Sequence, residues 1–411
     1  MVSKWLWGAA AARAAREGAA GMAARIAGLY GAQFLAIGMM MPLLPVWLHA
    51  RGLDAVLIGR VLAAQSLVRV VASPLLGQVA DRLGAIRPVM LGAAAASWLL
   101  LALTAWAADG ALMIAAGIVA SAFFFAPLVP LMETLAVRAG QRLGVAYGRL
   151  RLWGSLTFII GSMLAGVALD IIAARHLVWL LVAAQALVMA AVLLTPARAE
   201  GSAAAGAPGN SGSDSAHWRA LLSAPFMLFI VVAGLVQASH AFVYGFSALH
   251  WRQVGYSGAV VGLLWATGVV AEIILFWFSA HVQARFGPVR LLMLAAGAGL
   301  ARWAGLALDP PLAALFMLQA LHGLTFGAAH LGAIMYVHTR VPARLAATGQ
   351  AAYAAASMGL FMTPAMALSG WLYAHHGARG WLAMAAMCAV ALALGPLLRR
   401  LSPKEPDRAG A

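Results

Sequence analysis

Long apolar runs separated by short polar breaks dominate the chain. The runs lie near residues 26–48, 57–79, 88–107, 111–136, 150–170, 176–195, 222–248, 258–280, 289–308, 311–337, 346–373 and 380–399. Each can form a helix that crosses a bilayer, which needs about 20 mostly apolar residues. The pattern predicts an all-α integral membrane protein with about twelve transmembrane helices.

Composition and charge agree with a membrane protein. Hydrophobic residues make up 64% of the chain and charged residues 9%, unlike a soluble domain. If the amino terminus is cytoplasmic, most Lys and Arg residues are cytoplasmic, and those outside are Arg51, Arg60, Arg175, Arg252 and Arg379. This positive-inside bias predicts a multi-pass protein of the cell inner (plasma) membrane with both termini cytoplasmic and its basic side near anionic lipid. No basic stripe with interleaved aromatics exists, so the net charge of +15 does not indicate nucleic-acid binding.

A polar segment divides the twelve runs into two sets of six. Residues 201–215 (GSAAAGAPGNSGSDS) are rich in Gly, Ser and Ala, as in flexible linkers. We predict an amphipathic cytoplasmic lead-in at 1–24, with a misplaced start codon as the alternative. Six-helix bundles at 25–197 and 220–400, a linker at 198–219 and a tail at 401–411 follow, and we expect a monomer.

The two halves repeat one another in sequence. Residues 79–87 (VADRLGAIR) recur as 282–290 (VQARFGPVR), and residues 48–51 (LHAR) recur as 249–252 (LHWR). Two parallel six-helix repeats related by an axis along the membrane normal are the build of alternating-access transporters. The repeat therefore predicts two pseudo-symmetric six-helix bundles.

One cytoplasmic loop carries a motif. Residues 77–87 (GQVADRLGAIR) resemble the loop between spans two and three of the major facilitator superfamily. Gly77 and Gly84 permit a tight turn, and Asp81 can accept hydrogen bonds from Arg groups such as Arg82 and Arg87 or from a helix amino terminus. We expect this loop to latch the two halves in one state. An ordinary charged turn is the alternative.

Further segments resemble one branch of that superfamily, the phenylpropionate permease family, which is near the lactose permease type of proton symporter. They are residues 147–155 (YGRLRLWGS), 244–248 (YGFSA), 268–272 (GVVAE) and 321–326 (LHGLTF), and the similarity runs from about 28 to 381. The resemblance implies the major facilitator fold and proton-coupled import of a small organic solute, such as an aromatic acid.

Glu133 and Arg151 are a candidate substrate pair. They lie 18 residues apart across a turn. Each is about 13 Å of helix rise from that turn, so antiparallel neighbouring helices would place them at equal depth. The lactose permease type has a Glu and an Arg at this separation that contact the sugar, and an Arg fork also suits a substrate carboxylate. A structural ion pair is the alternative.

Glu272, Arg302 and His322 lie within three spans of the second half. A low-dielectric cavity favours a neutral carboxyl, and an approaching cation favours the ionised form, so Glu272 and Arg302 can form a proton switch that His322 bridges. The lactose permease type has an acid where this chain has Thr325 and a Lys where it has Gln319. We therefore expect Glu272 to carry the proton. Glu133, a structural pair and uncoupled transport stay open.

Arg69, His240 and His330 are further candidate substrate contacts within spans. Arg69 can be a counter-ion for an anionic substrate or for Glu133. A lone His in a span is more often a packed hydrogen-bonding group. His330 is about 80° around an ideal helix from His322. Structural roles for all three remain the alternative.

The sequence shows no signature of an enzyme. It has no nucleophile with a base, no phosphate loop and no cluster of metal ligands, and its single cysteine, Cys388, excludes a disulfide. We expect no metal and no cofactor, and a small organic solute and a proton as partners. The alternatives are a proton-driven exporter of drugs or metabolites and a solute sensor that does not transport.

Overall fold

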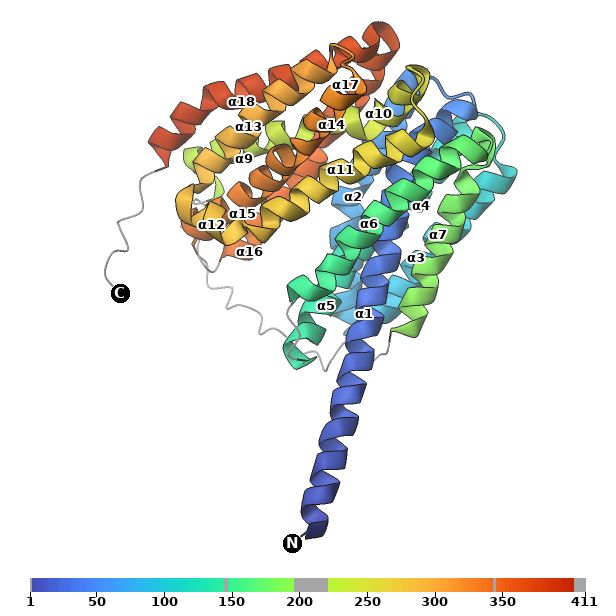
Figure 1. Ribbon diagram of the computed structural model, residues 1–411, viewed down its shortest axis with the longest axis vertical. Helices are drawn as coiled ribbons and strands as arrows, with labels where there is room; N and C mark the ends of the chain where they lie inside the picture. The colour runs from blue at the N-terminus through green and yellow to red at the C-terminus, as the bar shows by residue number, and fades with distance from the viewer. Residues whose placement is uncertain (1, 144–146, 196–220, 343–344, 403–411) are drawn as a thin grey trace. The chain divides into compact units, whose positions relative to one another are not determined.

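A computed structural model describes residues 2–143, 147–195, 221–342 and 345–402. Helices make up these ranges and no strand occurs within them (Figure 1). The predicted linker at 198–219 and all but the first two residues of the predicted tail at 401–411 lie outside the described residues.

The described helices confirm the all-α membrane fold. Eleven helical stretches are long and apolar enough to cross a membrane, and the last of them, Thr348–Leu401, has 54 residues. It contains two spans, because α17 (Met362–His376) ends at Gly377, which has a φ of +52°, and α18 (Trp381–Leu401) begins shortly after. The described part of the chain therefore holds the twelve spans that the apolar runs predict.

Contacts between Cα atoms divide the chain into two compact units. The first contains Met1–Trp47 and Val71–Pro208, and the second contains Leu48–Val70 and Gly209–Ala411. Residues 48–70 thus group with the second half, unlike in the predicted division at 25–197. Close packing explains this grouping, because a Cβ atom added at Gly59 of α2 (Ala55–Leu83) would lie 2.7 Å from the Cα of Gly370 of α17.

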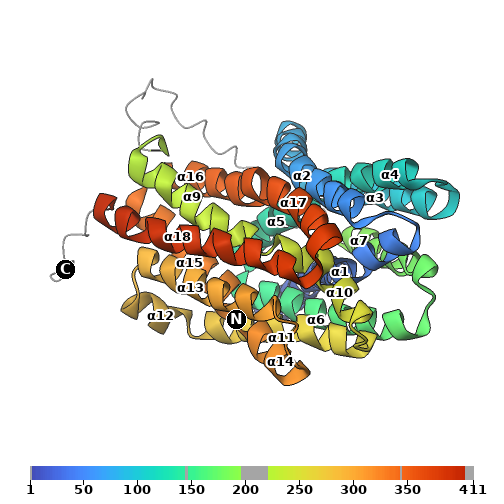
Figure 2. The same cartoon turned by 90° about the horizontal axis from the view of Figure 1, so that it is seen from above.

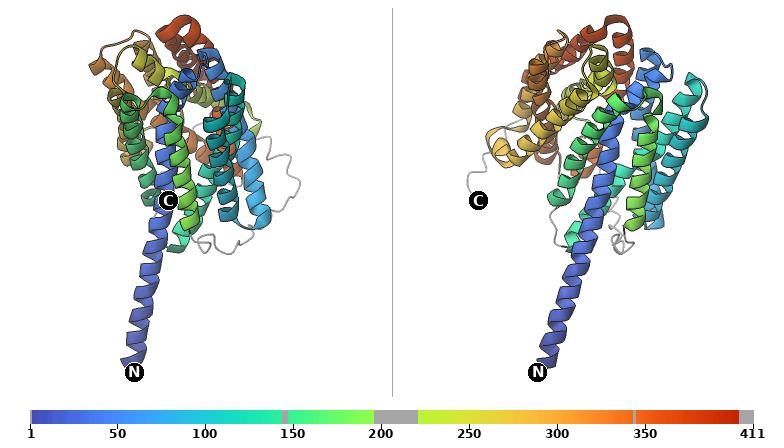
Figure 3. Two further views of the ribbon diagram at one scale, coloured as in Figure 1. Left: turned by 90° about the vertical axis from the view of Figure 1, so that its right-hand side faces the viewer. Right: turned by 45° about the vertical axis from the view of Figure 1, so that its right-hand side comes forward.

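The first unit contains five spans and part of a sixth. They are α1 (Val2–Ala50), residues 71–83 of α2, α3 (Ile86–Ala107), α4 (Ala111–Phe125) with α5 (Leu128–Leu143), α6 (Tyr147–Ile171) and α7 (Val178–Leu194). α3 packs between α4 and α7 (Figure 3), where buried Ser97 donates a hydrogen bond of 3.1 Å to Gln185. α1 is one unbroken helix whose first residues project beyond its own unit, so no break marks the predicted lead-in at 1–24.

The second unit carries the remaining spans. They are α9 (Ala224–Ala238) with α10 (Ala241–Gln253), α11 (Gly258–Trp277) followed by α12 (Ser279–Arg285), α13 (Pro288–Leu306), α14 (Leu312–Ala320) with α15 (Ala329–Arg340), α16 (Ala346–Ala355) with α17, and α18. α18 packs against both α13 and α9 (Figure 2). Stacked rings of Phe229 and Tyr336, with centroids 4.2 Å apart, lie in the core.

Several spans are interrupted in their middle. Span seven breaks at Ser239 and His240, between α9 and α10. Span ten contains a π-helix, Gly323–Ala328, and span eleven contains another, Ala356–Phe361. π turns within α-helices are rare and frequently lie at functional sites.

Glycines let α1 and α6 approach closely. A Cβ atom added at Gly161 would lie 2.5 Å from the carbonyl oxygen of Leu35, and buried Ser162 donates a hydrogen bond of 3.3 Å to the carbonyl of Gly38. We expect Gly161→Ala to lower stability by about 1–3 kcal/mol, because an added methyl group overpacks this contact. Thermal unfolding in detergent measures the change. Gly28→Ala is the matched control, because nothing lies within 4 Å of that position; equal losses in both variants would contradict the close contact.

Candidate functional site

Glu133 and Arg151 form an ion pair within the first unit. Glu133 lies on α5, Arg151 lies on α6, and Nη1 of Arg151 donates a hydrogen bond to Oε1 of Glu133. The exposed fractions of the two side chains are 35% and 43%, so neither charge is sealed in the protein. The pairing agrees with the depth that their spacing predicts. A substrate carboxylate that reaches Arg151 would compete with Glu133.

Arg302 is the centre of a buried polar cluster in the second unit. Arg302 is 1% exposed. Its guanidinium donates hydrogen bonds of 2.8 Å to both Gln319 Oε1 and Thr325 Oγ1. A third contact of 3.1 Å joins its Nη1 to Nδ1 of His322. Its Nε makes no hydrogen bond to any described residue. The cation is thus held by neutral acceptors of span ten.

The contact with Arg302 fixes the protonation of His322. A guanidinium has donors only, so Nδ1 of His322 accepts, and the neutral ring carries its hydrogen on Nε2. That Nε2 faces Oε2 of Glu272 at 3.8 Å, which is longer than a hydrogen bond. His322 therefore lies between the buried cation and the carboxyl group of α11.

Glycines bring α11 and span ten together at this point. A Cβ atom added at Gly323 would lie 2.6 Å from the carbonyl oxygen of Ala271, and one added at Gly268 would lie 3.2 Å from Cβ of His322. Gly323 and Gly327 are spaced as in the small-residue motif that lets transmembrane helices pack closely. This spacing is a sequence signal for the close approach of span ten to α11, which brings Glu272 near His322.

A ladder of three rings connects His330 to His322. The rings of His322 and Phe326 stack with centroids 5.3 Å apart, and those of Phe326 and His330 stack at 6.0 Å. Side chains four residues apart are neighbours on a helix, so Phe326 lies between the two histidines.

His240 lies inside the Arg302 cluster. It is fully buried, and its Nδ1 lies 3.2 Å from the carbonyl oxygens of Val236 and Gln237. Its Nε2 lies 3.1 Å from Thr325 Oγ1. In the sequence, Thr325 and Gln319 stand out only as departures from a family pattern, whereas both contact Arg302 directly.

Arg69 and the Arg302 cluster share a neighbouring residue, Tyr244. Arg69 is on the part of α2 that groups with the second unit, and its side chain is exposed. The hydroxyl of Tyr244 interacts electrostatically with Arg69, Glu272 and Arg302. The substrate contacts predicted for Arg69, His240 and His330 stay predictions.

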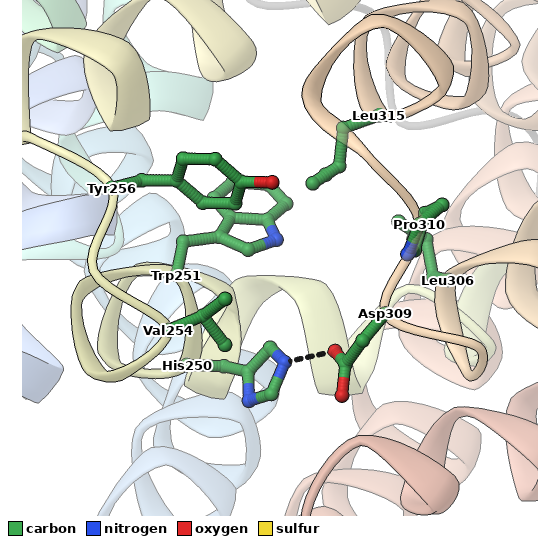
Figure 4. Close-up of a pocket in the computed structure, with 8 residues that line it drawn as sticks. All are labelled: His250, Trp251, Val254, Tyr256, Leu306, Asp309, Pro310 and Leu315. Atoms are coloured by element: carbon green, nitrogen blue, oxygen red, sulfur yellow. Dashed lines mark hydrogen bonds and ion pairs between the residues drawn. The ribbon is translucent and has the colours of Figure 1, made fainter.

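A hollow lies at the ends of α10 and α13 (Figure 4). Its empty volume is about 240 Å³, including space open to solvent, and apolar and aromatic side chains surround a hydrogen bond between His250 and Asp309. Nε2 of His250 lies 2.6 Å from Oδ1 of Asp309, which has a positive φ of 46°. The pair fixes the loop after α13 to the end of α10.

The candidate latch loop is a turn at the end of α2. Gly84 has a φ of +62°, and the backbone N–H of Ala85 donates to the carbonyl of Ala80 at 3.1 Å. Arg87 donates to the carbonyls of Val192 and Leu193 at 3.3 and 2.9 Å, at the end of α7, where cations stabilise a helix. Gly77 is partly buried, whereas Asp81 and Arg82 are exposed. The latch role stays a prediction.

Comparisons with known proteins identify the family. Residues 23–383 match the MFS_1 like family. The chain is 32% identical over 373 residues to the probable 3-phenylpropionic acid transporter of Escherichia coli (strain K12), covering 89% of this chain and 95% of that protein. It is 31% identical to the maltose permease of Geobacillus stearothermophilus, covering 80% and 82%.

A solved structure shows the same fold. The crystal structure of the nucleoside transporter NupG superposes with a TM-score of 0.79 over 93% of this chain and 100% of that chain, at 16% identity. Together with the twelve apolar spans, the bacterial relatives indicate a multi-pass inner-membrane protein. The chain belongs to the MFS_1 like family and is a transporter of the major facilitator superfamily.

Proposed function

We propose that the protein imports a small organic acid together with a proton. The observation that carries this proposal is the buried Arg302, which is held by neutral acceptors while the carboxyl group of Glu272 lies one imidazole away. Burying a cation without a direct anionic partner is costly, and a proton on Glu272 removes the partner that Arg302 would otherwise take. Loss of that proton draws Arg302 towards Glu272.

This exchange supplies a linkage between proton binding and helix position. Arg302, His322 and Glu272 lie on three different spans, so moving the cation changes how those spans pack. A site whose proton affinity differs between two conformations couples the proton to the conformational change. We place the proton on Glu272, and we place both termini on the cytoplasmic side.

The half-exposed pair of Glu133 and Arg151 is the proposed site for the substrate carboxylate. A guanidinium binds a carboxylate through two parallel hydrogen bonds, which orients the ligand. The relative named as a probable 3-phenylpropionic acid transporter supports an aromatic acid as the substrate. The maltose permease relative makes a sugar the class to test against it.

Uptake into proteoliposomes tests the proposal. Purified protein is reconstituted, and entry of labelled 3-phenylpropionate, maltose and a nucleoside is measured with and without an imposed pH gradient, acid outside. We expect 3-phenylpropionate to accumulate only with the gradient. Equal accumulation without the gradient would reject proton symport. Accumulation with the gradient reversed would indicate an exporter, and absence of transport for a bound solute would indicate a sensor.

A further inference from the structure

We propose that His240 is a second proton-binding residue, and that a proton on His240 and the contact of Arg302 with Thr325 exclude each other. The inference rests on the proposed proton coupling and specifies where the proton goes when it leaves Glu272. Three features of the buried cluster support it: the surroundings of Nδ1, those of Nε2, and the position of Arg302.

The break in span seven orients the ring of His240. Its Nδ1 lies 3.2 Å from the carbonyl oxygens of Val236 and Gln237, which belong to the last turn of α9. Carbonyl oxygens only accept, so Nδ1 carries a hydrogen in every state. The carboxyl end of a helix also stabilises a nearby cation. One side of the ring is therefore suited to an imidazolium.

The other side of the ring can serve both protonation states. In the neutral ring, Nε2 accepts from the hydroxyl of Thr325 at 3.1 Å. When a proton adds to the lone pair of Nε2, the new N–H donates to Thr325 Oγ1, and the hydroxyl hydrogen turns to the carbonyl oxygen of His322 at 3.4 Å. His240 thus keeps hydrogen-bond partners in both states, and only a hydroxyl rotates.

Arg302 competes with that proton. Its Nη1 donates to the same Thr325 Oγ1 at 2.8 Å, so a protonated His240 would place two positive charges around one buried oxygen. Like charges at this separation disfavour each other strongly when both groups are buried, as His240 and Arg302 are. The proton on His240 and Arg302 at Thr325 therefore cannot both be accommodated.

The titratable and charged groups around His240 include one acid with which Arg302 can pair. They are Arg302 of α13, His322 of span ten and Tyr244 of α10, with Glu272 of α11 behind His322. Glu272 is the acid among them. In the observed state Arg302 contacts Thr325, His240 is neutral and Glu272 holds the proton; in the other state Arg302 pairs with ionised Glu272 and His240 binds the proton.

The hydroxyl of Thr325 takes part in this exchange as both a donor and an acceptor of hydrogen bonds. A hydroxyl donates and accepts at once, whereas an ionised carboxylate only accepts. Thr325 can therefore bond to His240 in both states and to Arg302 in the observed state. We expect a hydroxyl at position 325, rather than its size, to set how strongly Arg302 opposes protonation of His240.

Nitrogen NMR of the full-length protein in lipid bilayers, with ¹⁵N-labelled histidine, tests the proposal. Neutral and protonated rings give distinct signals, and His240→Gln assigns the signal of His240. We expect His240 to be neutral with Nδ1 protonated at neutral pH. In Arg302→Gln the protonated signal should appear at a pH about one to three units higher, because a neighbouring cation has been removed. The same pH midpoint in both proteins, or no protonation of His240 in either, would overturn the proposal.

Thr325→Val and Thr325→Ser form a second, matched comparison that does not depend on removing Arg302. Val loses the hydroxyl and Ser keeps it. We expect the pH at which His240 is half protonated to change in Thr325→Val and to stay the same in Thr325→Ser. Identical midpoints in the two variants would reject the role of the Thr325 hydroxyl. These midpoints are measured without transport. Failure of proton-driven uptake in the unmodified protein would reject the import proposal and leave this result standing.

Discussion

Glu272→Gln protein in proteoliposomes is expected to equilibrate its substrate without accumulating it. For one proton per substrate, a gradient of about one pH unit supports about tenfold accumulation, and the variant should reach a ratio of about one. Gln keeps the size and polarity of the side chain but offers Arg302 no charge and binds no proton. Exchange of external label with preloaded substrate should survive, because exchange requires no net proton movement.

Asp309→Asn is the matched control for this variant. It removes a carboxylate of the same unit that pairs with His250 outside the Arg302 cluster, and it should retain accumulation. Unaltered accumulation in Glu272→Gln would show that the proton is carried without Glu272. Equal loss in both variants would indicate a general defect of the unit.

Arg151→Lys is expected to raise the Kd for an acidic substrate about 10- to 100-fold. Lys keeps the charge but lacks the planar fork, so it loses at least one charge-assisted hydrogen bond to a carboxylate, worth about 1.5–3 kcal/mol. Equilibrium binding of labelled 3-phenylpropionate to the purified protein measures this change.

Glu133→Gln separates a substrate role from a structural role for the same pair. If Arg151 binds the substrate, removing the competing carboxylate should leave affinity unchanged or raise it. If the pair only joins α5 to α6, Glu133→Gln should lower thermal stability and Arg151→Lys should bind normally. That second pattern would return both residues to a structural role.

The number of spans could be predicted from the sequence, and the twelve apolar runs are confirmed. The free energy of transfer into a bilayer is a property of each side chain and sums along a helix, so the sequence alone contains this information. The depth match of Glu133 and Arg151 followed from helix rise alone, and the structure pairs them. Neither inference required knowledge of how helices rotate against each other.

Features that depend on how helices rotate against each other could not be predicted from the sequence. The π turn at Gly323–Ala328 lies within span ten, and no feature of the sequence signalled it. The burial of His240 beside Thr325 depends on the break at Ser239, for which the sequence has no proline or glycine signal. The contact of Gly59 with Gly370 joins residues that are distant in the chain, so local patterns carry no trace of it.

Simultaneous recording of solute and proton entry tests whether the protein imports its substrate together with a proton. Proteoliposomes that contain a pH-sensitive dye are exposed to labelled 3-phenylpropionate with equal pH on both sides and the membrane potential clamped. We expect the interior to acidify as the label enters the unmodified protein's vesicles, whereas in Glu272→Gln the label should equilibrate without acidification. Entry of label through the unmodified protein at the full rate without internal acidification would contradict proton-coupled import.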